Sequence, residues 1–149
     1  MEPATLVFLV GDEGVCLGMK KRGFGTGLWN GYGGKVEANE DVCTAAIREL
    51  QEESGVVANE KNLREVAELN FFLADGTHIF VTVFLLFTWN GEPVETEEMK
   101  PDWFNVDHIP YETMWEDDQY WLPRVLAGEY VKGRVRFDTA NKIVEMEWQ

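Results

Sequence analysis

Glutamates crowd the stretch from Gly31 to Val56 at a spacing that suits chemistry on a divalent metal. On a helix, with about 100° per residue, Glu49, Glu52 and Glu53 fall within an arc of roughly 100°. Three converging carboxylates repel one another, and a hard cation such as Mg²⁺ or Mn²⁺ relieves that repulsion. A solvated helix face is the alternative, because Arg48 lies four residues before Glu52 and can form a surface ion pair.

The segment that carries these glutamates has the periodicity of an amphipathic helix. Apolar residues recur at i, i+3, i+4 and i+7 from Cys43 to Leu50, which places them on one face. The glutamates lie at the rim of this face, so the helix would hold them beside the core. Gly55 is the expected C-cap, and we predict a helix from about Asn39 or Glu40 to Ser54.

The stretch before the helix, Gly23 to Gly34, is expected to form a shaped loop that is neither helix nor strand. It contains six glycines and can offer backbone carbonyls and amides to a ligand. It is not a P-loop, because Trp29 and Val36 stand where the first Gly and the Ser or Thr should be. It is not the dinucleotide fingerprint either, because Leu28 replaces the third Gly. A P-loop or nicotinamide enzyme is therefore not expected.

A longer motif spans both the loop and the helix. Gly34 is followed after five residues by Glu40 and after seven more by Arg48, from which the chain reads RELQEESGV to Val56. This motif fills every fixed position of the Nudix box, and the chain resembles the Nudix hydrolases. The resemblance implies a single α/β domain over residues 1–149, an α/β/α sandwich with a mixed β-sheet, and metal-assisted hydrolysis of a nucleoside diphosphate linked to another group.

The same resemblance implies roles for the residues of this motif. The helix glutamates would hold the metal, and one of them or a metal-bound water would supply the base. A carbonyl of the paired glycines would add a ligand, as would the acidic loop near residue 98, where Glu98 is preferred over Glu97. Arg48 and Glu40 would orient the set. The implied catalytic residues are Arg48, Glu49, Glu52 and Glu53, and the implied metal ligands are Gly33 or Gly34, Glu49, Glu52, Glu53 and Glu98.

Segments outside this motif narrow the resemblance. The stretches GMKKRGFGTGLWNGYGGKV before the helix and EMKPDWF and MWEDDQYW after it resemble the MutT-related, animal-type 8-oxo-dGTPases, from the first strand to about Leu126. This implies hydrolysis of 8-oxo-dGTP, and of 2-oxo-dATP, to the monophosphate and pyrophosphate, which cleanses the nucleotide pool. Hydrolysis of methylated purine triphosphates, general nucleoside triphosphates or dinucleoside polyphosphates stays open, as does a nucleotide sensor without catalysis.

A purine needs a flat apolar slot with a few polar groups at its edge. Single aromatic residues are ordinarily core residues, and an Asp pair at a helix start is ordinarily a cap; the resemblance favours pocket roles instead. Two neighbouring carboxyls would raise each other's pKa, so one could donate a hydrogen bond while the other accepts, which is our hypothesis for reading both oxidised bases. The implied substrate-binding residues are Thr5, Lys20, Phe24, Asn30, Phe71, Met99, Trp115, Asp117 and Asp118, with Trp121 as a further wall.

The composition limits the partners of the chain. A net charge of -14 argues against binding a nucleic acid polymer, which needs clustered Lys and Arg. A small nucleotide carried by a divalent metal is still compatible with this charge. The main basic cluster, Lys20 to Arg22, suits capture of a triphosphate.

Length and terminal sequence point to a globular protein. With 149 residues and 45% hydrophobic residues, a core can form in one domain. The chain starts without a basic leader and has no segment of membrane-spanning length, so we expect a soluble, cytoplasmic protein that binds no membrane. We also expect a monomer. Cys16 and Cys43 lack the spacing of a zinc or disulfide site and are expected to be reduced core thiols.

The remaining pattern predicts hairpins on either side of a second helix, in a sandwich of helices on a sheet. The helix would start at Asp117 or Asp118 and run to about Ala127. The expected strands are Ala4–Val10, Val15–Met19, Val66–Leu73, His78–Thr88, a short strand over Trp103–Val106, Val131–Phe137 and Ile143–Trp148.

Overall fold

The computed structural model describes all residues from 1 to 149. Its eight strands form one sheet in the order β3-β2-β1-β5-β4-β7-β8, with β6 paired to β2. The strands are β1 (Glu2–Gly11), β2 (Gly14–Lys20), β3 (Trp29–Asn30), β4 (Leu63–Phe72), β5 (His78–Leu86), β6 (Met99–Phe104), β7 (Val131–Phe137) and β8 (Ile143–Trp148), and the helices are α1 (Val42–Ser54) and α2 (Asp118–Leu126), with short 3₁₀ turns η1 (Glu60–Asn62) and η2 (Tyr111–Thr113).

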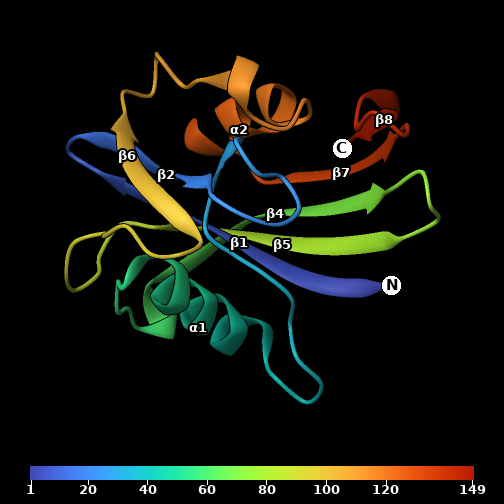
Figure 1. Cartoon of the computed structure of the whole chain (residues 1–149). Coiled ribbons are helices and arrows are strands. Elements are labelled where there is room, and N and C mark those ends of the chain that lie inside the picture. The colour runs from blue at the N-terminus through green and yellow to red at the C-terminus, as the bar shows by residue number, and fades with distance from the viewer.

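The sheet is mixed, and helices cover both of its faces. The pairs β1–β5 and β4–β7 are parallel, whereas the other neighbouring strands are antiparallel. Figure 1 shows α1 on one side of the sheet and α2 on the opposite side. The predicted α/β class with a mixed sheet in a sandwich is therefore confirmed.

β1 separates the two halves of the core. Val7 and Leu9 pack with Leu50 of α1, whereas Phe8 packs with Trp121 of α2. Because side chains alternate along a strand, a run of apolar residues serves both faces when helices cover both. The central position of β1 thus follows from its continuous apolar sequence.

α1 begins later than its periodicity suggested. Asp41 is the N-cap, and its side chain accepts a hydrogen bond from the Cys43 amide at 3.0 Å. Asn39 has a φ of 65°, which a right-handed helix does not allow. The predicted start at Asn39 or Glu40 was therefore wrong, whereas the C-cap at Gly55, with a φ of 80°, is confirmed.

The glycine-rich segment is more regular than predicted. Trp29 and Asn30 form β3 against β2, and Tyr32 and Lys35 bridge to β1. Gly33 lies so close to β1 that a Cβ there would be 1.8 Å from the Thr5 carbonyl oxygen. The prediction that this stretch contains no strand was wrong, because glycine here allows close approach of two backbones.

The other elements agree with the predictions in kind. The predicted bounds of β7 and β8 are confirmed, and the two earlier hairpins form within a few residues of their predicted bounds. β6 begins at Met99 and not at Trp103, because its pairing with β2 already starts at Met99, which lies opposite Lys20. Neither helix combines the length and apolar character needed to cross a membrane.

Candidate active site

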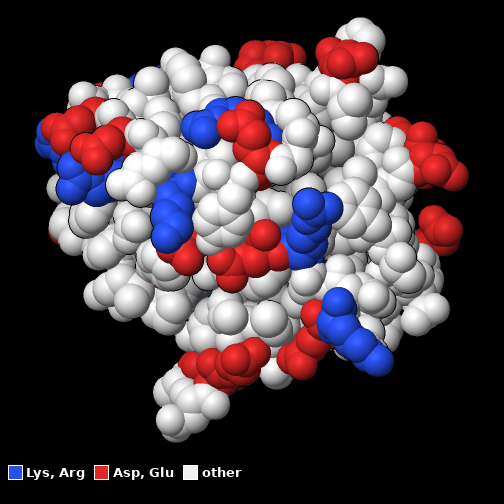
Figure 2. Space-filling view, turned by 180° about the vertical axis from the view of Figure 1, so that it is seen from behind, with Lys and Arg blue, Asp and Glu red and all other residues white.

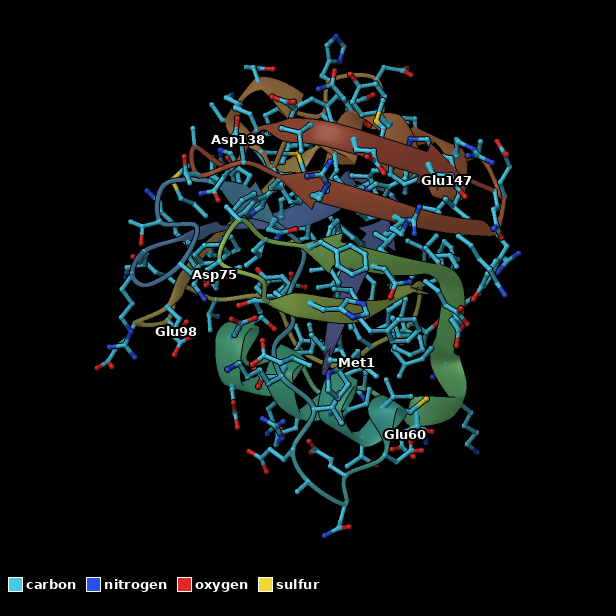
Figure 3. All side chains as sticks on the ribbon, turned by 90° about the vertical axis from the view of Figure 1, so that its right-hand side faces the viewer. Met1, Glu60, Asp75, Glu98, Asp138 and Glu147 are labelled. Atoms are coloured by element: carbon cyan, nitrogen blue, oxygen red, sulfur yellow. The ribbon has the colours of Figure 1, made fainter.

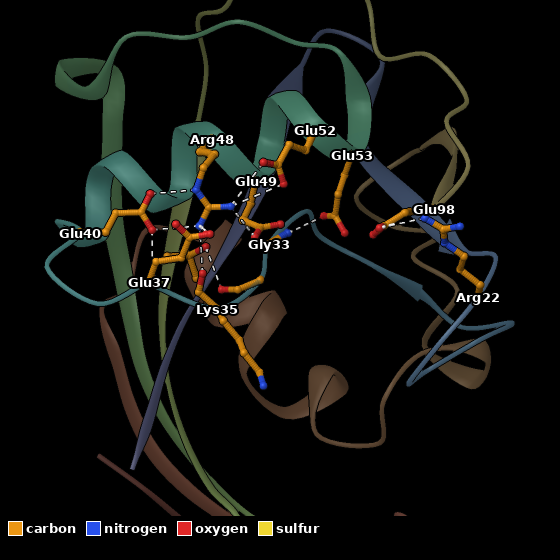
Figure 4. Close-up of polar contacts among 12 residues, drawn as sticks. Arg22, Gly33, Lys35, Glu37, Glu40, Arg48, Glu49, Glu52, Glu53 and Glu98 are labelled. Atoms are coloured by element: carbon orange, nitrogen blue, oxygen red, sulfur yellow. Dashed lines mark hydrogen bonds and ion pairs between the residues drawn. The ribbon is translucent and has the colours of Figure 1, made fainter.

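The last turns of α1 bring two glutamates onto the paired glycines of the preceding loop (Figure 4). Glu53 is only 3% exposed, and its Oε1 accepts a hydrogen bond from the Gly33 amide at 2.8 Å. A Cβ on Gly34 would lie 2.5 Å from the carboxyl carbon of Glu49. Both glycines therefore make room for carboxylates that the helix aims at the loop.

Arg48 joins the start of the motif to its end. Its Nε and Nη2 donate to the two carboxylate oxygens of Glu40 at 2.8 and 2.9 Å, and its Nη1 donates to Glu49 at 2.8 Å. Glu52 is a weaker partner at 3.5 Å. This bidentate hydrogen bonding with Arg48 lowers the pKa of Glu40 to about 2. Arg48 thus orients Glu49 and anchors the helix to the loop that precedes it.

The carboxylates of this site are buried with little positive charge beside them. Burial is the main cause that raises the pKa of Glu53 to about 7; the charges of Glu49 and Glu98 add to it, while the Gly33 amide and Lys20 oppose it. Burial likewise raises the pKa of Glu49. The Lys20 ammonium lies 4.0 Å from Glu53 and is the cation nearest to that carboxylate. A divalent cation would offset the remaining repulsion.

The donor chemistry fits such a cation, although the side chains do not converge on one point. No group of three or more His, Cys, Asp or Glu side chains is arranged to hold a metal ion. Glu49 is turned to Arg48, and Glu52 is 59% exposed. The Gly33 carbonyl accepts no hydrogen bond, whereas that of Gly34 accepts from the Thr5 amide at 2.9 Å. Hard oxygen donors are thus at hand, and the free carbonyl favours Gly33 over Gly34.

The acidic loop before β6 contributes a further carboxylate. Glu98 lies 3.4 Å from Arg22, and its charge raises the pKa of both Glu49 and Glu53. Glu97 is 86% exposed and also pairs with Arg22, at 3.6 Å. Figure 4 shows the Glu98 carboxylate on the side of Glu53. The position of Glu98 is therefore the better one for a metal ligand.

Thr96 connects this loop to α1, and sequence reasoning missed it. Its hydroxyl donates to the Glu53 carbonyl at 3.0 Å and accepts from the amides of Glu98 and Met99 at 3.3 and 3.2 Å. Lys21 holds the same loop through the Thr96 carbonyl at 2.8 Å. A threonine two residues before an acid is a weak turn signal, so only the fold reveals this link.

Only part of the predicted basic cluster faces the site. Lys21 is bound to Glu95 at 2.7 Å, and Arg22 is shared between Glu97 and Glu98. Lys20 alone of the three lines the cavity beside Glu53. The sequence suggested that all three side chains capture a phosphate, but only Lys20 is placed to do so.

A cavity of about 260 Å³ extends from Glu53 toward α2. Its lining includes Gly33 and Gly34, so it is continuous with the carboxylate cluster. All the residues predicted to bind substrate line it, together with Trp121, namely Thr5, Lys20, Phe24, Asn30, Phe71, Met99, Trp115, Asp117 and Asp118.

Aromatic rings form the walls of this cavity. Phe24 lies 5.0 Å from Trp115 between ring centroids, and it is 62% exposed at the mouth. Phe137, at the end of β7, is 5.9 Å from both Trp115 and Phe71. Sequence reasoning missed Phe137, because it ends an ordinary alternating strand and lies in no motif. Rings in this arrangement suit a flat aromatic ligand.

Two buried aspartates lie at the inner edge of the cavity. Asp117 and Asp118 are 2% and 3% exposed. Asp117 accepts a hydrogen bond from the Trp121 indole at 2.7 Å and caps no helix amide with its side chain. Asp118 Oδ2 has no hydrogen-bond partner in the chain. The ordinary capping role is thereby excluded, and Asp118 presents an unpaired polar atom beside the cavity.

The pKa values of the two aspartates are both raised, but to different extents. Burial is the main cause that raises the pKa of Asp117 to about 6, and the Trp121 bond opposes it. Burial and the charge of Asp117 raise the pKa of Asp118 well above its usual value. The upward shift is the stronger one for Asp118, so of the two carboxyls Asp118 is the one that burial favours most in its protonated form.

Comparison with known proteins places this geometry among relatives. Residues 1–125 match the NUDIX domain family. The chain is 43% identical over 142 residues to the oxidized purine nucleoside triphosphate hydrolase of Danio rerio, covering 95% of this chain and 90% of that protein. It is 41% identical over 141 residues to the protein of the same name from Mus musculus, covering 94% and 89%. The crystal structure of a mutator MutT protein from Bacillus halodurans, at 20% identity, has a TM-score of 0.86 over 100% of this chain and 98% of that one.

Proposed function

The chain belongs to the NUDIX domain family, and from that premise we propose that it hydrolyses oxidised purine nucleoside triphosphates with the help of a divalent metal. The substrates would be 8-oxo-dGTP and 2-oxo-dATP, and the products the monophosphate and pyrophosphate, so that damaged nucleotides leave the pool before DNA synthesis. One observation carries the proposal: a single cavity joins an aromatic slot with a buried aspartate pair to the carboxylates around Glu53.

The metal would be held by Glu49, Glu52, Glu53, Glu98 and the Gly33 carbonyl. The oxygen donors suit either Mg²⁺ or Mn²⁺, and we favour Mg²⁺ because nucleotides commonly arrive with it. When bound, the cation would neutralise phosphate charge and lower the pKa of the attacking water.

Side chains of the protein would accept the proton and position the phosphates and the metal ligands. Glu53 Oε1 accepts a hydrogen bond from the Gly33 amide, so Oε2 is left to bind the metal, and one of the helix glutamates or a metal-bound water would supply the base. Lys20, beside Glu53, would contact the phosphates, and Arg48 would keep Glu49 in position.

The aspartate pair would read the base. Asp118, protonated, would donate a hydrogen bond, and Asp117, ionised, would accept one; an exchange of the proton would fit the pair to a second base. Oδ1 of Asn30 accepts a hydrogen bond from the Gly31 amide, and the amide nitrogen of Asn30 makes no hydrogen bond within the chain. It would therefore donate to the base edge. Phe24 and Trp115 would stack on the ring faces.

Rival functions share the metal site but differ in the pocket. A Nudix hydrolase of methylated purine triphosphates, general nucleoside triphosphates or dinucleoside polyphosphates would need the same glutamates. A nucleotide sensor would not need the Arg48-oriented set that this chain has. We further propose a single domain over residues 1–149, since β7 beyond the family match pairs with β4 in the same sheet. We also propose that the protein is a cytoplasmic monomer.

A substrate panel tests the proposal. Initial rates with Mg²⁺ would be measured for 8-oxo-dGTP, 2-oxo-dATP, N6- and O6-methylated purine triphosphates and unmodified nucleotides, and ranked by kcat/KM. We expect the two oxidised purines to lead and Glu53→Gln to be inactive on all. Highest kcat/KM for a methylated or unmodified nucleotide would assign another substrate, and no pyrophosphate from any of them would exclude an enzyme of this type.

A further inference from the structure

Glu116 links the base pocket to the C-terminal hairpin. It stands between two residues of the pocket, Trp115 and Asp117. Its side chain points away to the first residue of β8, where Oε1 accepts a hydrogen bond from the Ile143 amide at 3.1 Å. Its Oε2 lies 3.5 Å from the ammonium of Lys142. One carboxylate thus bonds a segment 27 residues away to the middle of the pocket loop.

The hairpin that Glu116 holds is itself a wall of the pocket. The register of β7 with β8 shifts between Arg136 and Phe137, the point where β7 delivers Phe137 to the cavity. Such irregularities re-aim side chains. Phe137 is buried and meets Trp115 edge-on, with ring planes at 67°. This wall lies beyond residue 125, where the match to the family ends.

Hydrogen bonds brace the end of the hairpin, so it can act as a support. The Asp138 carboxylate accepts from the amides of Ala140 and Lys142 at 2.8 and 3.0 Å. β8 is the edge strand of the sheet, so an outward amide such as that of Ile143 has no strand to bind and takes Glu116 instead. Figure 3 shows Asp138 on the same side of the molecule as Asp75, in the turn after the strand that carries Phe71.

We propose that Glu116 is a positioning residue for base selection. By holding the start of β8, it fixes Trp115 against Phe137 and keeps Asp117 and Asp118 at their place in the slot. The proposal rests on the proposed function and adds a determinant of its specificity. The bond to the amide carries the effect, because the ion pair with Lys142 is exposed and such pairs contribute little.

The position of Glu116 predicts which kinetic parameter it controls. The carboxylates of Glu49 and Glu53 are held by other bonds, from Arg48 and the Gly33 amide, and Thr96 holds the Glu53 backbone carbonyl. Loosening the Glu116 contact would therefore change how the base fits and leave the reacting end in place. KM and base selectivity should respond, whereas kcat should stay within about twofold.

Steady-state kinetics on three variants test the proposal. We expect Glu116→Ala to raise KM for 8-oxo-dGTP about tenfold and to lower the kcat/KM ratio of 8-oxo-dGTP over dGTP by a similar factor, which matches loss of one charge-assisted hydrogen bond. Glu116→Gln keeps a carbonyl acceptor and should restore most of the ratio. Glu112→Ala, an acid on η2 that makes no hydrogen bond, is the matched control and should behave as the wild type.

Amide exchange measured by NMR separates this proposal from the proposed function. The Ile143 amide should be protected in the wild type and in Glu116→Gln, and should exchange faster in Glu116→Ala, whatever the substrate is. Equal protection in all three proteins would overturn the link itself. An unchanged selectivity ratio in Glu116→Ala, or an equal fall of kcat on both substrates with a lowered Tm, would overturn its role in selection. Failure of the wild type to hydrolyse oxidised purines would count against the proposed function alone.

Discussion

Glu53 is the residue on which the proposed chemistry depends, and its burial gives it a pH-dependent affinity for metal. Its pKa is raised from 4.5 to about 7. The stabilisation from its buried, protonated form is fully present below the unfolded pKa and is lost as pH rises through the folded pKa. A divalent cation needs the ionised carboxylate, so protons and metal compete for it.

We therefore expect saturating Mg²⁺ to raise the Tm of the protein more at about pH 8 than at about pH 6. Thermal unfolding with and without Mg²⁺ at both pH values measures this difference. Glu53→Gln, which keeps the size of the side chain, should reduce the Mg²⁺ effect and remove its pH dependence. A Mg²⁺ shift of the same size at both pH values in the wild type would contradict the assignment.

Asp118 and Asp117 allow a second prediction about single residues. Asp118→Asn keeps a donor but removes the proton that the pair exchanges. We expect kcat/KM to fall about tenfold more for one of the two oxidised bases than for the other, because only one base needs Asp118 to accept. The pH profile near the Asp117 pKa of about 6 should also change. Unchanged rates and profiles on both bases would refute the hypothesis of proton exchange.

Single residues also show how far sequence reasoning reaches. The glutamates of α1 could be predicted because their spacing on one helix is a local property, and the structure places Glu49 and Glu53 at the paired glycines. Thr96 and Phe137 could not be predicted, because their roles arise from contacts between distant segments. The spacing of Glu49 and Glu53 can be read from the sequence alone, whereas the contact of Phe137 with the cavity depends on the fold.

The acidic loop before β6 is the element that ties the metal site to the β2–β3 loop. Thr96 binds it to the end of α1, and Lys21 binds it to the segment that leads to Phe24. Glu98 therefore takes its position from contacts on both sides. This makes Thr96 the best single residue at which to test whether the loop matters.

Thr96→Val removes the hydroxyl at nearly constant volume and takes a hydrogen bond away from three partly buried backbone groups, the Glu53 carbonyl and the amides of Glu98 and Met99. We expect kcat to fall about tenfold and the Mg²⁺ concentration for half-maximal rate to rise. Thr96→Ser should restore both values, and Thr139→Val, at an exposed turn position without a side-chain hydrogen bond, is the control. Loss of Tm with no change in Mg²⁺ dependence would mean that the loop is only structural.

Element bounds depended on details that periodicity does not contain. The apolar stripe from Cys43 to Leu50 does not say where α1 begins, and the helix begins after Asp41 because that side chain caps it. Asn39 then turns with a positive φ and frees Glu40 to bind Arg48. The late start of α1 and the contact between Glu40 and Arg48 thus have the same structural cause.

At the scale of the whole molecule, the charge distribution sets the range of partners. Figure 2 shows Lys and Arg atoms beside Asp and Glu atoms, with no continuous basic surface on this face. Lys21 and Arg22 are occupied by glutamates of the acidic loop. With a net charge of -14, the protein should avoid long phosphate polymers and accept a nucleotide only in its cavity.

We expect excess single- or double-stranded DNA to leave the rate of nucleotide hydrolysis unchanged, even at low ionic strength. The rate with and without DNA, at fixed free Mg²⁺, provides the measurement. Inhibition by DNA that disappears as salt is added would reveal an electrostatic binding surface and would contradict this expectation.

The order of the strands could not be predicted from the residues. Each hairpin is local and could be recognised, including β7–β8 at its predicted bounds. The parallel pairs β1–β5 and β4–β7 join segments far apart in the chain, and periodicity does not indicate which strands meet. The resemblance to a known family supplied the sandwich, and the pairing of β7 with β4 brings Phe137 to the cavity.

The most direct test of the central claim is a competition between 8-oxo-dGTP and dGTP in one reaction. Both nucleotides, at equal concentration with Mg²⁺, would be followed by chromatography as the wild-type protein consumes them. We predict that 8-oxo-dGTP disappears first, with 8-oxo-dGMP and pyrophosphate formed in equal amounts, while dGTP persists. Equal consumption of both nucleotides, or consumption of dGTP first, would contradict the account.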